Sequence, residues 1–222
     1  MYVPDHFALT AEQSREILSR PRAANLVTHH ASGLHATLAP FFHVDRGGGH
    51  GTLVTHLVRT NPQAREAADG EALVILDVDD AYVSPAWYPT NADQPDVPTW
   101  DYVTVHAYGE LTLHDDPEWA LAAARELTGR HEPDSVLADV GEDRLARMAR
   151  AIVGVEVRLT RVVGKAKMSQ NRHPVDIAGV AEALGEHHGE MATFLREVSL
   201  PYAEARYQLL ADLRETRGRR LR

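Results

Sequence analysis

Residues 100–114 read Trp-Asp-Tyr-Val-Thr-Val-His-Ala-Tyr-Gly-Glu-Leu-Thr-Leu-His, and they contain the clearest strand pattern in the sequence. From Val103 to Leu113 apolar residues alternate with polar ones, as they do in a β-strand that turns one face to a core. The opposite face carries His106 and Tyr108. The stretch therefore predicts a long strand with two titratable side chains on its polar face.

Five more segments have the composition of strands, and turns or short helical patterns separate them. One of them, residues 72–76, is continuously apolar, so we interpret it as a short strand that is covered on both faces. The sequence thus predicts about six antiparallel strands, in a mainly β fold with α-helices arranged as a barrel with helical decoration. The five segments are residues 23–28, 34–44, 51–58, 72–76 and 153–159.

Helical patterns fall between the strands and at the end of the chain. Thr10 and Gln13 form a capping-box pattern, which begins the first helix. From Pro174 onward the composition is helical. We therefore divide the chain into a barrel domain, residues 1–172, and a helical C-terminal segment, residues 173–222, that packs on the barrel or on a partner subunit. The other predicted helices are residues 117–128, 142–150, 175–184, 190–198 and 202–213.

The composition argues against several classes of protein. The 222 residues carry a net charge of -9 and no cysteine, which disfavours broad attraction to nucleic acid and removes disulfides and cysteine metal sites. No apolar run approaches the roughly 18 residues that a membrane span needs, and no signal peptide is evident, so we expect a cytoplasmic protein. The one basic cluster is C-terminal, where we expect a solvated, frayed end: Arg214, Arg217, Arg219, Arg220 and Arg222.

Residues 53–62 read Leu-Val-Thr-His-Leu-Val-Arg-Thr-Asn-Pro, a strand that leads into a helix start. Asn61 suits the N-cap and Pro62 suits the first helical position. We therefore expect a short helix over residues 63–69 that Gly70 ends. Because the free N–H groups at the start of a helix attract anions, the stretch predicts a binding site for an anionic group.

His56 and Arg59 stand just before this junction. Imidazole is the commonest side-chain metal ligand, and a guanidinium group is well suited to phosphates and carboxylates. The pair indicates a cofactor that has an anionic group and a metal. The alternative, a surface strand end with two solvated polar side chains, stays equally open on this stretch alone.

Polar and aromatic residues concentrate in four stretches at strand ends or loops. Trp87 and Trp100 offer flat walls, and Lys165 and Lys167 offer charges, which together suit a planar cofactor. The alternatives are that each tryptophan packs in the core and that each lysine is solvated. The sequence contains no Gly-x-Ser-x-Gly and no His-Glu-x-x-His, so no motif supports a hydrolase function. The four stretches are residues 56–62, 84–88, 97–106 and 165–171.

Six motifs follow one another along the chain: Met1-Tyr-Val-Pro4, His56-x-x-Arg59-x-Asn61-Pro62, Ala81-Tyr-Val-Ser-Pro-Ala-Trp-Tyr88, Val97-Pro-Thr-Trp-Asp-Tyr102, Val105-His-Ala-Tyr-Gly109 and Lys167-Met-Ser-Gln-Asn-Arg172. In order and spacing they resemble the PaiB-like proteins, often labelled FMN-binding negative transcriptional regulators, across residues 1–185. The resemblance implies a split β-barrel homodimer with the cofactor at the subunit interface.

The motifs also resemble a haem-dependent branch of that family, the piperazate synthases, which close an N–N bond in N5-hydroxy-ornithine with loss of water. The axial ligand of that branch lies in the strand-end motif, where His56 matches it. We therefore expect haem b ahead of FMN, with His56 as the metal ligand. FMN would instead imply a flavin oxidoreductase or a PaiB-type transcriptional regulator. The acidic charge and the absence of a helix-turn-helix pattern argue against nucleic acid as a partner.

The predicted site thus serves a cofactor and a small-molecule substrate. Three residues are expected to transfer protons in catalysis: His106, Tyr108 and Lys167. Eight residues are expected to bind the cofactor: His56, Arg59, Asn61, Trp87, Tyr88, Trp100, Ser169 and Gln170.

Overall fold

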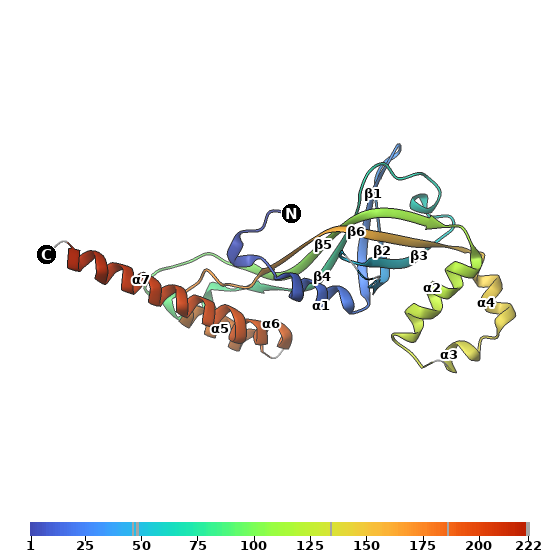
Figure 1. Cartoon of the computed structure of the whole chain (residues 1–222). Helices are drawn as coiled ribbons and strands as arrows, with labels where there is room; N and C mark the ends of the chain where they lie inside the picture. Colours follow the sequence, from blue (N-terminus) through green and yellow to red (C-terminus); the bar gives the residue numbers. More distant parts are fainter. Residues whose placement is uncertain (46, 48, 134, 186, 221–222) are drawn as a thin grey trace. The chain divides into compact units, whose positions relative to one another are not determined.

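The computed structural model describes residues 1–45, 47, 49–133, 135–185 and 187–220 (Figure 1). The chain forms two compact units, each assembled from separate stretches of sequence. The first unit comprises Met1, Leu9–Asp77 and Thr104–Gly164, and the second comprises Tyr2–Ala8, Val78–Val103 and Lys165–Arg222. The predicted domain boundary between residues 172 and 173 stays a prediction.

Six strands of the described residues form a closed barrel in the order β1-β2-β3-β6-β5-β4. The pairs β1–β2, β1–β4, β2–β3 and β3–β6 are antiparallel. The predicted mainly β fold, a barrel with helices between its strands, is therefore confirmed. The strands are β1 (Arg22–His30), β2 (Gly33–Val44), β3 (Thr52–Val58), β4 (Ala72–Val83), β5 (Thr99–His114) and β6 (Ile152–Lys167).

Apolar side chains of the first unit fill the core of the barrel because they alternate along the strands. Val105 and Ala107 of β5 are fully buried, whereas His106 between them is only partly buried. On β3, Leu53 and Leu57 belong to the same core. The alternation predicted for residues 100–114 thus places an apolar face inside. Other members of this core are Leu26, Phe41, Val74, Val155 and Val157.

The helices of the first unit precede β1 or lie between β5 and β6. The predicted capping box is present, since the Thr10 hydroxyl accepts from the Gln13 N–H at 3.1 Å and the Gln13 side chain accepts from the Thr10 N–H at 2.9 Å. Ala123 and Leu127 of the second helix pack against Val54 of β3. These helices are α1 (Ala11–Ser19), α2 (Pro117–Gly129), α3 (Ser135–Ala138) and α4 (Glu142–Ala149).

Three helices pack together in the second unit (Figure 1): α5 (Pro174–Leu184), α6 (Gly189–Phe194) and α7 (Leu200–Arg220). A π-helical turn, Leu195–Ser199, joins α6 to α7 without a break. The helices predicted over residues 190–198 and 202–213 are therefore present, but the predicted break between them is wrong. Pro201 closely follows the π-helical turn, where the backbone already departs from the α-helical hydrogen-bond pattern.

Two further predictions of local structure need correction. The segment predicted as a short strand over residues 72–76 belongs to the longer β4, whose Ala72, Val74 and Leu76 are buried while the residues between them are only partly buried. β4 is therefore fully covered on one face only.

The C-terminal arginines were predicted to lie in a frayed tail, but Arg214 and Arg217 lie in α7. Arg222 lies outside the described residues. No helix in the described part of the chain combines the length and the apolar character that crossing a membrane requires.

Candidate functional site

Five side chains of the second unit lie together on three neighbouring strands, β4, β5 and β6. We call this set the aromatic–lysine face, and it consists of Tyr82, Trp100, Tyr102, Lys165 and Lys167. The residues that alternate with them along the strands are buried, which places Tyr82, Trp100, Tyr102 and Lys165 on the outward side. Lys167 ends β6, and its ammonium lies at the edge of this side, against the Thr99 hydroxyl and the Trp100 carbonyl. The buried alternating residues are Ala81, Val83, Asp101, Val103, Ala166 and Met168.

The aromatic–lysine face carries two half-exposed rings and two ammonium groups. The rings of Tyr82 and Trp100 meet edge to face with centroids 6.1 Å apart, and the two residues are 48% and 53% exposed. The Lys165 ammonium lies 5.2 Å from the centroid of the Tyr102 ring. Lys167 Nζ donates to Thr99 Oγ1 at 2.7 Å and to the Trp100 carbonyl. Because neighbouring exposed aromatic rings mark ligand or partner surfaces, this face is the first candidate site.

Lysine itself is rare in this chain, and its distribution is informative. Lys165 and Lys167 are the only lysines of the sequence, and every other basic side chain apart from histidine is an arginine. Lysine offers a compact charge that is a standard partner of phosphate, whereas arginine offers a planar fork. Both lysines stand on the aromatic–lysine face, so this face differs chemically from the rest of the surface.

Trp87 and Tyr88, which were predicted to wall the cofactor, make other contacts in the second unit. Tyr88 is buried, and the Arg172 guanidinium lies 4.8 Å from the centroid of its ring. The Trp87 carbonyl lies so close to Gly179 of α5 that a Cβ at Gly179 would overlap with it. The structure therefore places the Trp87 backbone against α5 and the Tyr88 ring against Arg172.

Ser169 and Gln170 lie in the turn after β6 and are buried. The Ser169 hydroxyl donates to Asp101 Oδ2 at 2.7 Å. The Gln170 side chain accepts from the Met168 N–H at 2.8 Å and donates to the Ala166 carbonyl at 2.7 Å. These bonds hold the end of β6 next to the start of β5. Their predicted role in binding a cofactor stays a prediction.

The helix predicted over residues 63–69 is wrong, because only one 3-10 turn, η2 (Pro62–Ala64), follows Asn61. The Asn61 side chain caps this turn as predicted, accepting from the Gln63 N–H at 2.9 Å. The Gln63 side chain is buried and donates to the Leu26 carbonyl at 3.1 Å, which ties the turn to the barrel and directs the chain away from a helix. A single turn provides little of the dipole that was expected to attract an anion.

The Arg59 guanidinium is engaged within the first unit, and its predicted role in binding a cofactor stays a prediction. Nε donates to the Arg150 carbonyl at 3.0 Å and Nη2 to the Ile152 carbonyl at 3.2 Å. Nη1 forms an ion pair with Asp115. Arg59 thus fixes the end of β3 to the start of β6, and an incoming phosphate would have to displace the carboxylate of Asp115.

His56 lies on the side of β3 that faces away from Leu53 and Leu57. It pairs across the sheet with Gly154, and the space above Gly154 is filled by the Trp119 ring. Burial lowers the pKa of His56, and its Nδ1 is buried with no hydrogen-bond partner among the described residues. The imidazole is therefore neutral near pH 7, which is the form that binds metals.

His106 and Tyr108 stand together on β5, as the alternating pattern predicted, with ring centroids 6.3 Å apart. Burial lowers the pKa of His106, the positive amino terminus lowers it further, and Asp77 opposes both. The Tyr108 hydroxyl accepts from the Met1 amino group at 3.2 Å, and the Arg161 guanidinium lies 3.5 Å from the centroid of its ring. This pair belongs to the first unit and Lys167 to the second.

The candidate metal ligand is a single histidine. Within the residues that the structure describes, no three histidine, cysteine, aspartate or glutamate side chains gather to hold a metal ion. Haem iron takes four ligands from its porphyrin, so His56 alone would meet the protein's share of that coordination. The described residues would therefore offer haem one imidazole, that of His56, whereas they form no site for a bare metal ion.

A comparison with protein families decides where the chain belongs. Residues 1–161 match the family described as "Putative FMN-binding domain". The chain belongs to this PaiB-like FMN-binding family. Over 204 residues it is 29% identical to "Protease synthase and sporulation protein PAI 2" of Bacillus subtilis, an alignment that covers 89% of this chain and 96% of that protein. The resemblance predicted from the six motifs is thereby confirmed.

Solved structures confirm the split-barrel type of fold. The flavocytochrome Anf3 from Azotobacter vinelandii is similar with a TM-score of 0.56 and 14% identity, over 74% of this chain and 72% of that one. The FAD and Heme binding protein from Mycobacterium smegmatis is similar with a TM-score of 0.50 and 15% identity, over 71% of each chain. At such low identity these likenesses concern the fold alone. The homodimer stays a prediction.

The family motifs cover part of the aromatic–lysine face, but Tyr82, Tyr102 and the buried Asp101 were not predicted as site residues. Tyr102 follows Trp100 by two residues, so the strand period alone could have placed both on one face. Tyr82 could have been found in the same way from β4, had its full length been recognised. Asp101 stands at a position where the alternation predicts an apolar residue, and a charge there is a signal for function.

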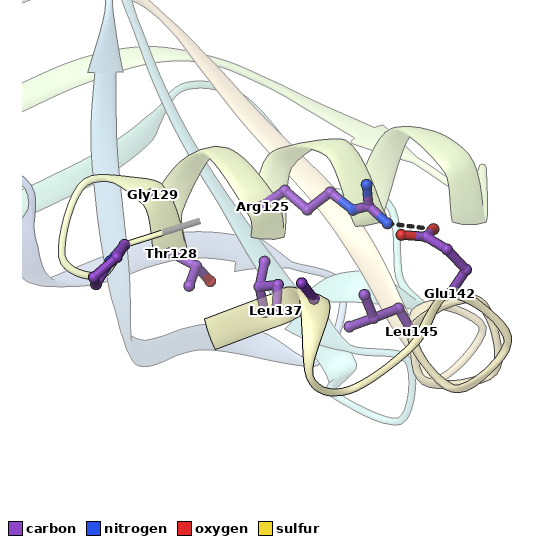
Figure 2. Close-up of a pocket in the computed structure, with 8 residues that line it drawn as sticks. Arg125, Thr128, Gly129, Leu137, Glu142 and Leu145 are labelled. Atoms are coloured by element: carbon purple, nitrogen blue, oxygen red, sulfur yellow. Dashed lines mark hydrogen bonds and ion pairs between the residues drawn. The ribbon is translucent and has the colours of Figure 1, made fainter. Parts of the chain in front are cut away.

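A separate pocket of about 240 Å³ lies between helices of the first unit (Figure 2). An ion pair between Arg125 of α2 and Glu142 of α4, with an N–O distance of 2.6 Å, stands at its edge. None of the predicted site residues lines it. The lining residues are Arg125, Thr128, Gly129, Pro133, Leu137, Ala138, Glu142 and Leu145.

Proposed function

We propose that this protein binds FMN on the aromatic–lysine face and uses it as an oxidoreductase of small molecules. The observation that carries the proposal is the exposed ring pair of Tyr82 and Trp100, with the Lys165 ammonium near the neighbouring Tyr102 ring and the Lys167 ammonium on the Trp100 carbonyl. Membership of a family described as FMN-binding supports it. Bound FMN would supply hydride-transfer chemistry, and the protein would supply binding and orientation.

Different side chains of the aromatic–lysine face would bind different parts of FMN. Trp100 is half exposed, and its flat ring offers a stacking surface to an isoalloxazine ring system. Lys167 is held in place by Thr99 and the Trp100 carbonyl, so its charge is already positioned for a phosphate. Lys165 adds a second positive charge two residues away on the same strand.

A second copy of the chain would complete this site. The aromatic–lysine face is open on its outer side, and exposed rings of this size are usually covered by a ligand or a partner. In a homodimer with two-fold symmetry, the same face of each subunit can be closed by its partner. We therefore include the predicted homodimer in the proposal, with the flavin at the subunit interface.

Lys167→Met should weaken FMN binding about tenfold, because one charge-assisted contact to the phosphate is lost. Riboflavin, which lacks the phosphate, should bind the variant and the wild type equally. Quenching of flavin fluorescence measures both affinities. Arg15→Met, which removes an exposed arginine of α1, is the matched control and should change neither. If Lys167→Met weakens riboflavin as much as FMN, Lys167 does not contact the phosphate.

A second candidate function rests on His56, a neutral and partly buried imidazole without a partner for Nδ1 among the described residues. It supports haem b with His56 as the axial ligand. The two neighbours in fold whose names mention haem or a cytochrome support the same reading. The reaction would be the dehydrative cyclisation of N5-hydroxy-ornithine: the N–O bond breaks, an N–N bond forms, and the hydroxyl leaves as water with a proton from the amine. His106 and Tyr108 would hold or move that proton.

Absorption spectra of protein incubated with haem and with FMN distinguish the two candidates. Under the haem proposal, a sharp Soret band appears and His56→Ala abolishes it, while His131→Ala, at an exposed histidine, leaves it unchanged. Incubation of that form with N5-hydroxy-ornithine should then give a product lighter by one water. Paired flavin bands that survive His56→Ala, without a Soret band, would instead favour the FMN-dependent oxidoreductase.

A further inference from the structure

Asp101 is a carboxylate in the interior of the second unit, directly behind the aromatic–lysine face. It has no exposed surface, although it lies on β5 between Trp100 and Tyr102 of that face. Oδ2 accepts the hydroxyl of Ser169 at 2.7 Å. Oδ1 has no hydrogen-bond partner within the described part of the chain, and its nearest charged neighbour is Lys167 Nζ at 3.7 Å. A buried carboxylate with one bare oxygen is costly, so a structural role alone explains it poorly.

The turn after β6 holds this arrangement in one geometry. Ser169 has a φ of 59°, a left-handed conformation that few residues other than glycine adopt. The turn is closed by a hydrogen bond from the Arg172 N–H to the Ser169 carbonyl at 2.8 Å and by both bonds of the Gln170 side chain. Backbone strain of this kind persists only where the surroundings fix it, and it occurs preferentially at functional sites.

Lys167 is therefore fixed from two sides. Thr99 Oγ1 and the Trp100 carbonyl accept from its ammonium, and the bare oxygen of Asp101 attracts it without a hydrogen bond. The lysine side chain is 26% exposed and the carboxylate is fully buried, so an anion from solvent can reach only the lysine. The charge of Asp101 therefore affects the binding of that anion through Lys167.

We propose that Asp101 is a positioning residue that holds Lys167 on the aromatic–lysine face and sets how strongly Lys167 attracts an anion. This inference rests on the proposed function in one respect, namely that the anion is the phosphate of FMN. When Asp101 is ionised, it offsets much of the charge of Lys167 and the phosphate binds more weakly. When Asp101 is neutral, Lys167 presents its full charge.

The protonation state of Asp101 changes in an accessible range of pH. Burial raises the pKa of Asp101 to about 6, and the hydroxyl of Ser169 and the charge of Lys167 lower it less than burial raises it. The other titratable group that interacts with it is Tyr88. Burial raises the pKa of Tyr88, Arg172 lowers it, and Asp101 and Asp176 raise it further. Tyr88 therefore stays neutral near pH 6, which leaves Asp101 as the group that switches.

The first test reads Lys167 directly and needs no flavin. Reductive methylation with ¹³C-formaldehyde labels the two lysines and the amino terminus, and dimethyl-lysine keeps its charge. The NMR signal of Lys167 should shift in a step centred near pH 6, while the signal of Lys165 serves as the internal control. Asp101→Asn should remove the step, because a neutral amide cannot titrate. A step that persists in Asp101→Asn, or its absence from the wild type, would overturn the proposal.

A second variant keeps the proposal testable if Asp101→Asn does not fold. Ser169→Ala removes the hydroxyl that stabilises the ionised carboxylate, so it should move the Lys167 step to higher pH. An unchanged midpoint in Ser169→Ala would contradict the proposed geometry of the turn.

The final test links Asp101 to the cofactor, through the ratio of the FMN dissociation constants of wild type and Asp101→Asn. The ratio cancels the titration of the FMN phosphate itself, whose second pKa is about 6. At pH 8 the variant should bind FMN about fivefold more tightly, and at pH 5 the two proteins should bind it equally. Lys167→Met should remove the difference at pH 8. A ratio that does not change with pH would refute the link, whereas a wild type that shows the Lys167 step but binds no FMN would refute the proposed function alone.

Discussion

Replacing Gly109 with alanine should destabilise the protein by about 3 kcal/mol, near the upper end of what overpacking a core costs. Gly109 lies on β5 with an ordinary negative φ, so the requirement for glycine is one of space. A Cβ at this position would overlap with the carbonyl oxygen of Arg158 on β6 and would lie 2.9 Å from Val157 Cγ1. Because the barrel is closed, β6 cannot move outward without disturbing its pairing with β3. Urea denaturation followed by circular dichroism measures the change.

Gly129→Ala is the matched control for this prediction. Gly129 is the last residue of α2, and a Cβ there would meet no atom within 4 Å. The substitution should be neutral or slightly stabilising, because alanine loses less conformational entropy than glycine on folding. Equal effects of the two substitutions would mean that the approach of β6 does not explain Gly109.

The sequence predicted the strands well because a β-strand with one buried face has a simple local signature. The alternation around Val105 and Ala107 is visible without any knowledge of what lies opposite. The capping box of Thr10 and Gln13 is equally local, and it was predicted correctly for the same reason. Family resemblance then supplied the closure into a split barrel, which periodicity alone does not provide.

The helix predicted after Asn61 is wrong because whether it forms depends on distant partners. Nothing near Arg59 in the sequence shows that Asp115 and the carbonyls of Arg150 and Ile152 occupy its guanidinium. Gln63 is likewise held by a carbonyl of β1, 37 residues away. Such contacts decide whether a helix start forms, and a helix propensity read from a short window does not include them.

The types of side chain at the candidate site could be predicted from the sequence more easily than which residues lie together there. Trp100 and Lys167 were predicted as an aromatic wall and a charge, and the structure places the Lys167 ammonium on the Trp100 carbonyl. Tyr88 has the same chemistry as Trp100, but Tyr88 is buried against Arg172 whereas Trp100 is half exposed. That difference in exposure depends on tertiary packing, which the local sequence does not show.

Asp101→Asn should stabilise the folded protein by about 3 kcal/mol at pH 8, and this gain should vanish at low pH. The pKa of the Asp101 carboxyl is about 6 in the folded protein, because burial raises it from its ordinary value of 3.8. Folding thus favours the neutral carboxyl. The stability that the neutral form contributes is fully present below pH 3.8 and is lost as the pH rises through about 6.

The Asp101→Asn variant carries a neutral amide at every pH, so its free energy of unfolding does not show this loss. The difference in free energy of unfolding between variant and wild type should therefore be small at pH 4, grow through pH 5 and 6, and become constant above pH 7. Urea denaturation of both proteins across this range measures it. Ser169→Ala provides the opposite case, because loss of the hydroxyl that bonds Oδ2 should lower the stability at pH 8 more than at pH 4. If Asp101→Asn is instead destabilising by the same amount at all pH values, the attraction between Asp101 and Lys167 outweighs the cost of burying the carboxylate, and Asp101 stays ionised throughout.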